Sequence, residues 1–169
     1  MRRVPRRRQV GNVTSFGFSP IGLVHSPYRS LSQAPPQDGK EIAVIEVYRE
    51  YSEGLKDLEH FSHINVFYWL HLSKGWDLLL NTPWDTQPHG VFSTRSPRRP
   101  VPIGFSVVEL VGRRGNFLAV RGLDAVDGTP VLDIKPYVPS IDSVPHASSG
   151  WMDGKIPHDF SMEEDSSEA

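Results

Sequence analysis

The chain contains no cysteine among its 169 residues. This absence excludes disulfide bonds, thiolate metal sites and cysteine nucleophiles, and it fits the reducing cytoplasm, where we expect the protein to be located. No apolar run approaches the roughly 20 residues that a membrane span needs, so we expect no membrane association. The formal net charge is only −2, which excludes a polyanion binder that uses its whole surface.

The charges are concentrated at the two ends of the chain. The stretch MRRVPRRRQV carries five arginines and no acid, whereas SMEEDSSEA at the other end is acidic. Neither end has enough apolar surface to offset the entropy of ordering, so we predict a disordered basic arm over 1–15 and an irregular to disordered acidic tail over 146–169. The arm is suited to bind RNA or an anionic surface, and a solvated tail without a partner explains it equally well.

Residues 16–145 are predicted to form one mainly β domain, a small barrel or curled sheet with one short helix. The helix is expected over 49–61, where Tyr51, Leu55 and Leu58 have the spacing of one apolar face. A polar loop is expected over 82–89. β-branched and aromatic residues at short intervals predict strands over 16–25, 41–48, 64–72, 91–94, 104–111, 117–123 and 131–134.

Common catalytic and nucleotide-binding motifs are missing from the sequence. His60 and His63 are three residues apart, whereas a zincin helix needs two histidines four apart with a glutamate after the first, and His71 lies farther on. We therefore expect no metal site. The sequence has no G-x-S-x-G nucleophile elbow, no P-loop and no G-x-G-x-x-G between a strand and a helix, so a nucleotide-like ligand would need another framework.

The stretch GVFSTRSPRRPVPIGFSVVEL, residues 90–110, holds Arg95, Arg98 and Arg99 among prolines. Proline fixes φ and removes a backbone donor, so this loop is expected to be stiff and unable to join a sheet. Guanidinium groups bind carboxylates and phosphates in a bidentate manner, and a stiff loop lowers the entropy lost on binding. The pattern therefore predicts an anion-binding loop.

A second stretch, GLDAVDGTPVLDIKPY, combines Asp124, Asp127 and Asp133 with turn residues, and Lys135 and Tyr137 follow one strand later. This grouping of acids with a lysine and a tyrosine predicts a polar site. A plain turn at Asp127 and a loop cap at Asp124 are the simpler explanations, and the sequence leaves both open.

Four ordered blocks carry a family resemblance. Residues 90–110 resemble the signature of TsaA/TrmO-like proteins, usually G-V-F-A-T-R-S-P-x-R-P-N-P-I-G-x-S, and GLDAVDGTPVLDIKPYVP (122–139) resembles the family's second signature. IGLVHSPY (21–28) and GLKDLEHFSHINVFYWLH (54–71) match in order and spacing. The resemblance covers roughly residues 19–142.

The resemblance implies a small β-barrel that acts as a homodimer. It implies an S-adenosylmethionine-dependent tRNA methyltransferase that modifies the exocyclic N6 of threonylcarbamoyl-adenosine next to the anticodon. The family's cofactor contacts carry over to Asp38, Gly39, Lys40, His71, Leu72, Arg95, Phe105, Arg121, Gly122, Leu123 and Asp124.

Chemical type suggests a role for several of these side chains. Arg95 suits the carboxylate of the cofactor, Asp124 suits the ribose or the ammonium group, and Leu72 and Phe105 suit the adenine.

For the RNA substrate, Arg98 and Arg99 are expected to bind tRNA. Asp127 is the candidate acceptor of the N6 proton, and Lys135 and Tyr137 are candidates for holding the threonylcarbamoyl group or stacking on the base.

One departure from the first signature is Val101, which stands where the family usually has asparagine. It keeps one alternative open, the same cofactor with a different RNA or small-molecule acceptor. A second alternative is a dimeric S-adenosylmethionine-binding protein without enzymatic activity.

Overall fold

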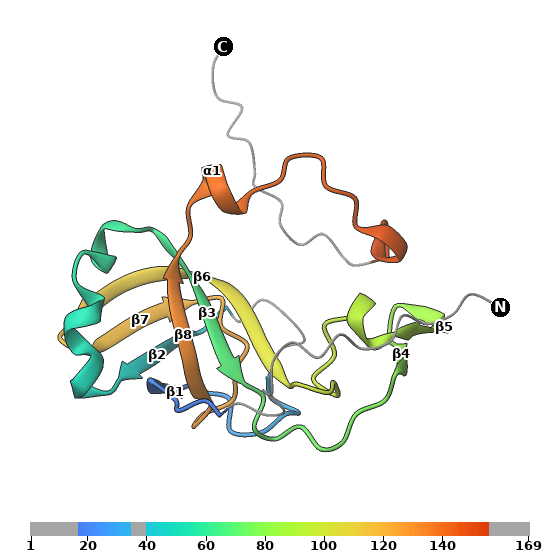
Figure 1. Ribbon diagram of the computed structural model, residues 1–169, viewed down its shortest axis with the longest axis horizontal. Coiled ribbons are helices and arrows are strands. Elements are labelled where there is room, and N and C mark those ends of the chain that lie inside the picture. Colours follow the sequence, from blue (N-terminus) through green and yellow to red (C-terminus); the bar gives the residue numbers. More distant parts are fainter. Residues whose placement is uncertain (1–16, 35–39, 156–169) are drawn as a thin grey trace, which may run out of the picture.

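The computed structural model describes residues 17–34 and 40–155 (Figure 1). The predicted basic arm, the end of the predicted acidic tail, and the candidate cofactor residues Asp38 and Gly39 lie outside the described residues. None of the helices in the described part is long and apolar enough to cross a membrane.

Six antiparallel strands close into a barrel, which confirms the predicted fold class. Around the barrel the order is β1–β2–β7–β6–β3–β8, and β8 pairs with β1 to close it. Closure leaves no free sheet edge. The strands are β1 (Gly22–His25), β2 (Ile42–Val47), β3 (His63–Trp69), β6 (Ile103–Arg114), β7 (Phe117–Arg121) and β8 (Pro130–Pro136).

Alternation of apolar residues explains which side of each strand faces the interior. In β3, Ile64, Val66 and Tyr68 are buried, and in β7 Leu118 and Val120 are fully buried. Because successive side chains of a strand point to opposite faces, these positions fill the barrel and their neighbours lie outside. The interior is therefore a packed core of aliphatic side chains with one tyrosine at its edge.

The predicted helix over 49–61 is two short 3-10 helices, η1 (Arg49–Leu55) and η2 (Leu58–His60). Asp57 separates them with a left-handed φ of 67°. Leu55 and Leu58 are buried as expected, but Tyr51 is 44% exposed. The break at Asp57 ends the helical spacing, so the three residues do not share one face.

Two local predictions are wrong. The expected loop over 82–89 lies mostly in a β-hairpin, β4 (Leu79–Thr82) and β5 (Asp85–Gly90), which forms a separate two-stranded sheet. The expected strand over 91–94 is the 3-10 helix η3 (Val91–Ser93), because the chain turns as it leaves the hairpin. Val91 is buried there, while Phe92 is 78% exposed.

After β8 the chain leaves the barrel and forms a connecting arm, residues 137–155, that reaches the β4–β5 hairpin (Figure 1). The arm contains α1 (Pro139–Asp142) and η4 (Gly150–Met152). Trp151 stacks on His89 with ring centroids 3.7 Å apart, and its Nε1 donates to the carbonyl of Ser93 at 2.8 Å. Lys155 forms an ion pair with Asp85. These contacts tie the arm to the hairpin.

Candidate functional site

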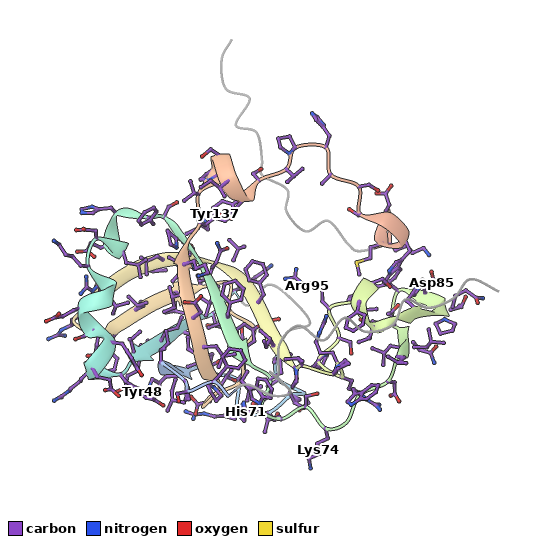
Figure 2. The ribbon with its side chains drawn as sticks, viewed as in Figure 1. Tyr48, His71, Lys74, Asp85, Arg95 and Tyr137 are labelled. Atoms are coloured by element: carbon purple, nitrogen blue, oxygen red, sulfur yellow. The ribbon has the colours of Figure 1, made fainter. Side chains whose placement is uncertain are left out.

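A cavity of about 500 Å³ lies at the end of the barrel where β3 leaves it. His71 and Lys74, which lie on the segment that follows β3, mark this end of the molecule in Figure 2. The lining comes from four separate parts of the chain: Leu31 and Ala34; Tyr68 and residues 70–74; Pro97 and Arg98; and Asp124, Ala125, Val126 and Thr129.

Three polar side chains form a hydrogen-bonded cluster beside this cavity. The hydroxyl of Tyr68 donates to Oδ1 of Asp124 at 2.8 Å, and the hydroxyl of Ser106 donates to the same oxygen at 3.2 Å. The two hydroxyl oxygens are 3.0 Å apart. Oδ2 of Asp124 accepts no hydrogen bond from the residues that the structure describes, so a carboxylate oxygen remains available to a ligand.

The direction of the tyrosine hydrogen bond is fixed by electrostatics. Burial, followed by the nearby charge of Asp124, raises the pKa of Tyr68 above its ordinary value. The hydroxyl therefore keeps its proton at neutral pH and remains a donor. Asp124 accepts both hydrogen bonds through Oδ1.

The turn that brings Asp124 to the cavity begins at Gly122, whose φ is 95°. Only glycine adopts this conformation readily, so the chain can leave β7 and turn inward here. Leu123 follows and is fully buried in the core. Of the predicted segment 121–124, only Asp124 lines the cavity; Arg121 lies on the outside and pairs with Glu109.

The arginine–proline loop is braced by hydrogen bonds as well as by its prolines. Arg99 donates from Nη1 to the carbonyls of Thr94 at 3.2 Å and Ser96 at 3.4 Å, so it supports its own loop. The hydroxyl of Ser73 donates to the carbonyl of Pro97 at 2.7 Å. Arg98, predicted to bind tRNA, lines the cavity and pairs with Asp77.

Arg95 lies beside the cavity and is not part of its lining. Its Nη2 donates to the carbonyl of Phe105 at 3.0 Å, and its guanidinium is 5.9 Å from the centroid of that ring. Its positive charge acts on the pKa of Tyr68 in the lowering direction, against the larger effect of burial. Arg95 is therefore close enough to the cluster to influence a ligand there.

The other predicted cofactor residues differ in position. His71 and Leu72 line the cavity as expected, and Leu72 is 41% exposed. Phe105 is on the outer face of β6, packed against Phe67 with centroids 5.1 Å apart. Lys40 lies just before β2 and is not among the lining residues.

The candidate proton acceptor, Asp127, has both carboxylate oxygens engaged. Oδ1 accepts from the backbone N–H of Ser26 at 3.0 Å, and Oδ2 pairs with Arg29. Asp127 does not line the cavity. The contacts fix the turn after β1, whose continuation at Leu31 is part of the cavity wall.

The structure also separates Lys135 and Tyr137 from the cavity. Lys135 pairs with Asp133 at 2.8 Å, and Tyr137 lies beside His63, with ring centroids 6.4 Å apart. His63 begins β3, and the cavity lies at the end of that strand, roughly 20 Å away for seven residues. Figure 2 shows Tyr137 and His71 at opposite ends of the barrel.

A second cavity of about 530 Å³ lies at that opposite end. Its charged lining residues, Glu50, Lys56 and Asp133, lie toward solvent, and no buried polar side chain belongs to its described lining. Aromatic and aliphatic residues form the rest of its wall, including Tyr51 and Phe61.

Tyr68, Gly104 and Ser106 are not among the site residues predicted from the sequence. One signal was present: Tyr68 continues the inward alternation of Ile64 and Val66, and a buried tyrosine hydroxyl requires a partner. The sequence did not show which residue that partner would be.

The fold and site define a small closed barrel with a nucleoside-sized cavity. The family model described as tRNA-methyltransferase O N-terminal domain matches residues 23–143. The chain belongs to this family.

Relatives and solved structures agree with this assignment. A "Probable S-adenosyl-L-methionine-binding protein" of Archaeoglobus fulgidus is 51% identical over 81% of this chain and 38% of its own length. The "tRNA (adenine(37)-N6)-methyltransferase" of Escherichia coli K12 is 37% identical over 82% of this chain and 65% of its own. The crystal structure of TrmO from Pseudomonas aeruginosa has a TM-score of 0.68 and 34% identity, covering 81% of this chain and 62% of that one. The chain thus spans less than two thirds of the length of each of these three.

Proposed function

We propose that the protein is an S-adenosylmethionine-dependent methyltransferase that modifies N6 of threonylcarbamoyl-adenosine next to the anticodon of tRNA. The observation that carries the proposal is Asp124, an acceptor held by two hydroxyl donors at a cavity of about 500 Å³. The name of the Escherichia coli relative supports the reaction, and the names of the archaeal relatives support the cofactor.

The residues of the cavity fit this cofactor. The volume is within the roughly 300–1,000 Å³ typical of small-molecule sites. Asp124 offers a free carboxylate oxygen to a ribose hydroxyl, Leu72 offers apolar surface to the adenine, and Arg98 offers a guanidinium to the carboxylate. When bound, the cofactor supplies an electrophilic methyl group.

The protein's main task in this reaction is to position the acceptor amine, because proximity and orientation account for much of the rate. We assign Arg95, which lies against Phe105 outside the lining, to the incoming RNA, since Arg98 is the arginine of this loop that lines the cavity. Asp127 would have to release Ser26 and Arg29 to accept a proton. We therefore assign it a structural role in the turn after β1.

A homodimer would complete the site. Phe105 and Val107, on the outer face of β6, are 40% and 41% exposed, and Phe105 lies against Arg95. A second copy that covers this apolar face would bring its own surface to the mouth of the cavity. The partner subunit's Lys135 and the partner subunit's Tyr137 are the residues we assign to the threonylcarbamoyl group, because a single chain separates them from the cavity.

The test is incubation with methyl-labelled S-adenosylmethionine and total tRNA, followed by mass spectrometry of the nucleosides. We expect the label in methylated threonylcarbamoyl-adenosine, and an Asp124→Asn protein as the matched control should give little product. Label in another nucleoside would identify a different acceptor. Tight cofactor binding without label in any RNA would instead favour the second candidate, a binding protein, which the names of the archaeal relatives support.

A further inference from the structure

Two residues outside the predicted site, Tyr68 and Ser106, contact Oδ1 of Asp124, and a third, Gly104, packs against the tyrosine ring. Tyr68 is in β3, and Gly104 and Ser106 are in β6, directly across the strand pair: Tyr68 is opposite Gly104 in the register. Asp124 approaches from the turn after β7. Each of the three segments belongs to a different block of the family resemblance, and only the fold brings them together.

Gly104 is required by the position of the tyrosine ring. A Cβ atom at this residue would be 2.2 Å from Cε2 of Tyr68 and 2.6 Å from Cζ. Both distances are shorter than any ordinary contact, so a side chain here would displace the ring. Tyr68 is only 4% exposed, and the core around it leaves little room for such a shift.

The backbone of β8 has a β-bulge opposite Tyr68. Phe67 pairs with Asp133 and Tyr68 pairs with Val131, so Leu132 is an extra residue in the ladder. Such bulges redirect side chains and increase the local twist of the sheet. The bulge and the glycine on either side of β3 together define where the Tyr68 hydroxyl lies.

We infer that Tyr68, Ser106 and Gly104 act as positioning residues for the cofactor: the two hydroxyls orient the Asp124 carboxylate so that its free oxygen accepts from a ribose hydroxyl, and Gly104 makes room for the tyrosine. The inference rests on the proposed function. Tyr68 and Ser106 both donate hydrogen bonds to Oδ1 of Asp124. The other carboxylate oxygen, Oδ2, is therefore the one that can accept from a ligand.

The ligand group expected at Asp124 is a hydroxyl and not the ammonium of the methionine moiety. Burying an ammonium beside the apolar lining costs more than burying a neutral hydroxyl, because the charge loses more hydration. Donation from two neutral hydroxyls also spreads the negative charge of the carboxylate, which weakens its attraction for a cation.

Calorimetry with two ligands tests this inference. The probes are S-adenosylhomocysteine and its 2′,3′-dideoxy analogue, each titrated into wild type, Tyr68→Phe and the control Tyr51→Phe, a tyrosine of the second cavity. We expect Tyr68→Phe to weaken S-adenosylhomocysteine by roughly tenfold or more, because a misplaced Asp124 loses its charge-assisted hydrogen bond to the ribose, and to leave the dideoxy analogue unchanged. A role limited to stability would weaken both ligands equally.

Two further variants, Ser106→Ala and Gly104→Ala, test the same positioning role. Ser106→Ala should show the same ligand selectivity with a smaller effect, because its hydrogen bond is longer. Gly104→Ala should resemble Tyr68→Phe if it folds, as judged by circular dichroism. In a methyl-transfer assay, Tyr68→Phe should raise KM for the cofactor and leave kcat nearly unchanged, as expected for an interaction that is equal in the ground and transition states.

The outcomes separate this inference from the function on which it rests. If wild type does not bind S-adenosylhomocysteine, the proposed function fails and the inference fails with it. If wild type binds and Tyr68→Phe binds equally well, or loses both ligands to the same extent, only the positioning role is overturned.

Discussion

The two ends of the barrel carry cavities of nearly equal volume, about 500 and 530 Å³, that differ in chemistry. At the end of β3, Asp124 presents a free carboxylate oxygen that is oriented by two hydroxyls. At the start of β3, the charged residues of the cavity lie toward solvent, and Asp133 pairs with Lys135. Volume alone therefore does not identify a ligand site, whereas convergent polar groups do.

The walls of both cavities are braced by an arginine. Arg99 donates to the carbonyls of its own loop at the first cavity. At the second cavity, Arg113 donates to the carbonyl of Leu55 and to Glu59, which ties η1 to η2. The difference between the two ends therefore lies in the polar cluster around Asp124, which has no counterpart in the described lining of the second cavity.

Substitution of the carboxylate should produce the largest difference between the two ends. Asp124→Asn is expected to weaken S-adenosylhomocysteine by roughly 10- to 100-fold, since it removes the charge and replaces one acceptor oxygen with an NH2 donor. Asp133→Asn, the matched change at the second cavity, should leave the affinity within about twofold. Calorimetry of both variants measures the contrast, and equal effects would contradict it.

A smaller effect is expected from the arginines. Arg98→Ala should weaken cofactor binding by about three- to tenfold, less than the loss of a buried ion pair would, because its side chain is 56% exposed and screened by solvent.

Arg95→Ala should weaken cofactor binding less and tRNA binding more. The slope of tRNA affinity against salt concentration, on logarithmic axes, should become shallower by roughly 0.7–0.9 for each phosphate that is no longer neutralised. Anisotropy titrations of tRNA at several salt concentrations measure this slope. A larger change in slope for Arg98→Ala than for Arg95→Ala would show that Arg98 binds the RNA.

Acid should release the arm and leave the barrel closed. A hydrogen bond from Lys155, helped by the backbone at Gln87 and by His89, holds the pKa of Asp85 well below its usual range. The stabilisation is thus fully present above the unfolded value of about 4 and is lost as pH falls through the lowered pKa. The indole N–H resonance of Trp151 should report this release, because it is bonded to Ser93.

The matched control for the arm is Asp85→Asn, which should weaken the tie at neutral pH and flatten its acid dependence. A Trp151 resonance that shifts identically with pH in both proteins would show that Asp85 does not hold the arm.

The smallest effect is expected at the second cavity. Tyr51→Ala removes a large aromatic side chain from its wall, but the residue is 44% exposed, so the barrel should remain folded. We expect cofactor affinity within about twofold of wild type by calorimetry. A loss as large as that of Asp124→Asn would mean that the ligand occupies this end.

Strands in which every second residue is apolar can be predicted from the sequence, because that alternation shows which side of the strand is buried. Ile64, Val66 and Tyr68 show it, and so do Leu118 and Val120. The hairpin β4–β5 was missed because β5 is largely exposed and contains Pro88, so it lacks the alternation that marks a half-buried strand. Its pairing depends on β4 and on the arm, which local sequence does not show.

The candidate site was predicted in part. Leu72, His71 and Asp124 were found through the resemblance, and the structure places all three at the cavity. Lys135 and Tyr137 were grouped with Asp124 because they are close in sequence, but β8 carries them along the barrel to its other end. Residues that are close in sequence lie far apart in space when an extended strand such as β8 separates them.

The most direct test of the account is a crystal structure of the protein with bound S-adenosylhomocysteine. We predict the nucleoside in the cavity at the end of β3, with a ribose hydroxyl within hydrogen-bond distance of Oδ2 of Asp124 and the Tyr68 hydroxyl still on Oδ1. A nucleoside in the second cavity, between Tyr51 and Asp133, would contradict the assignment of the site.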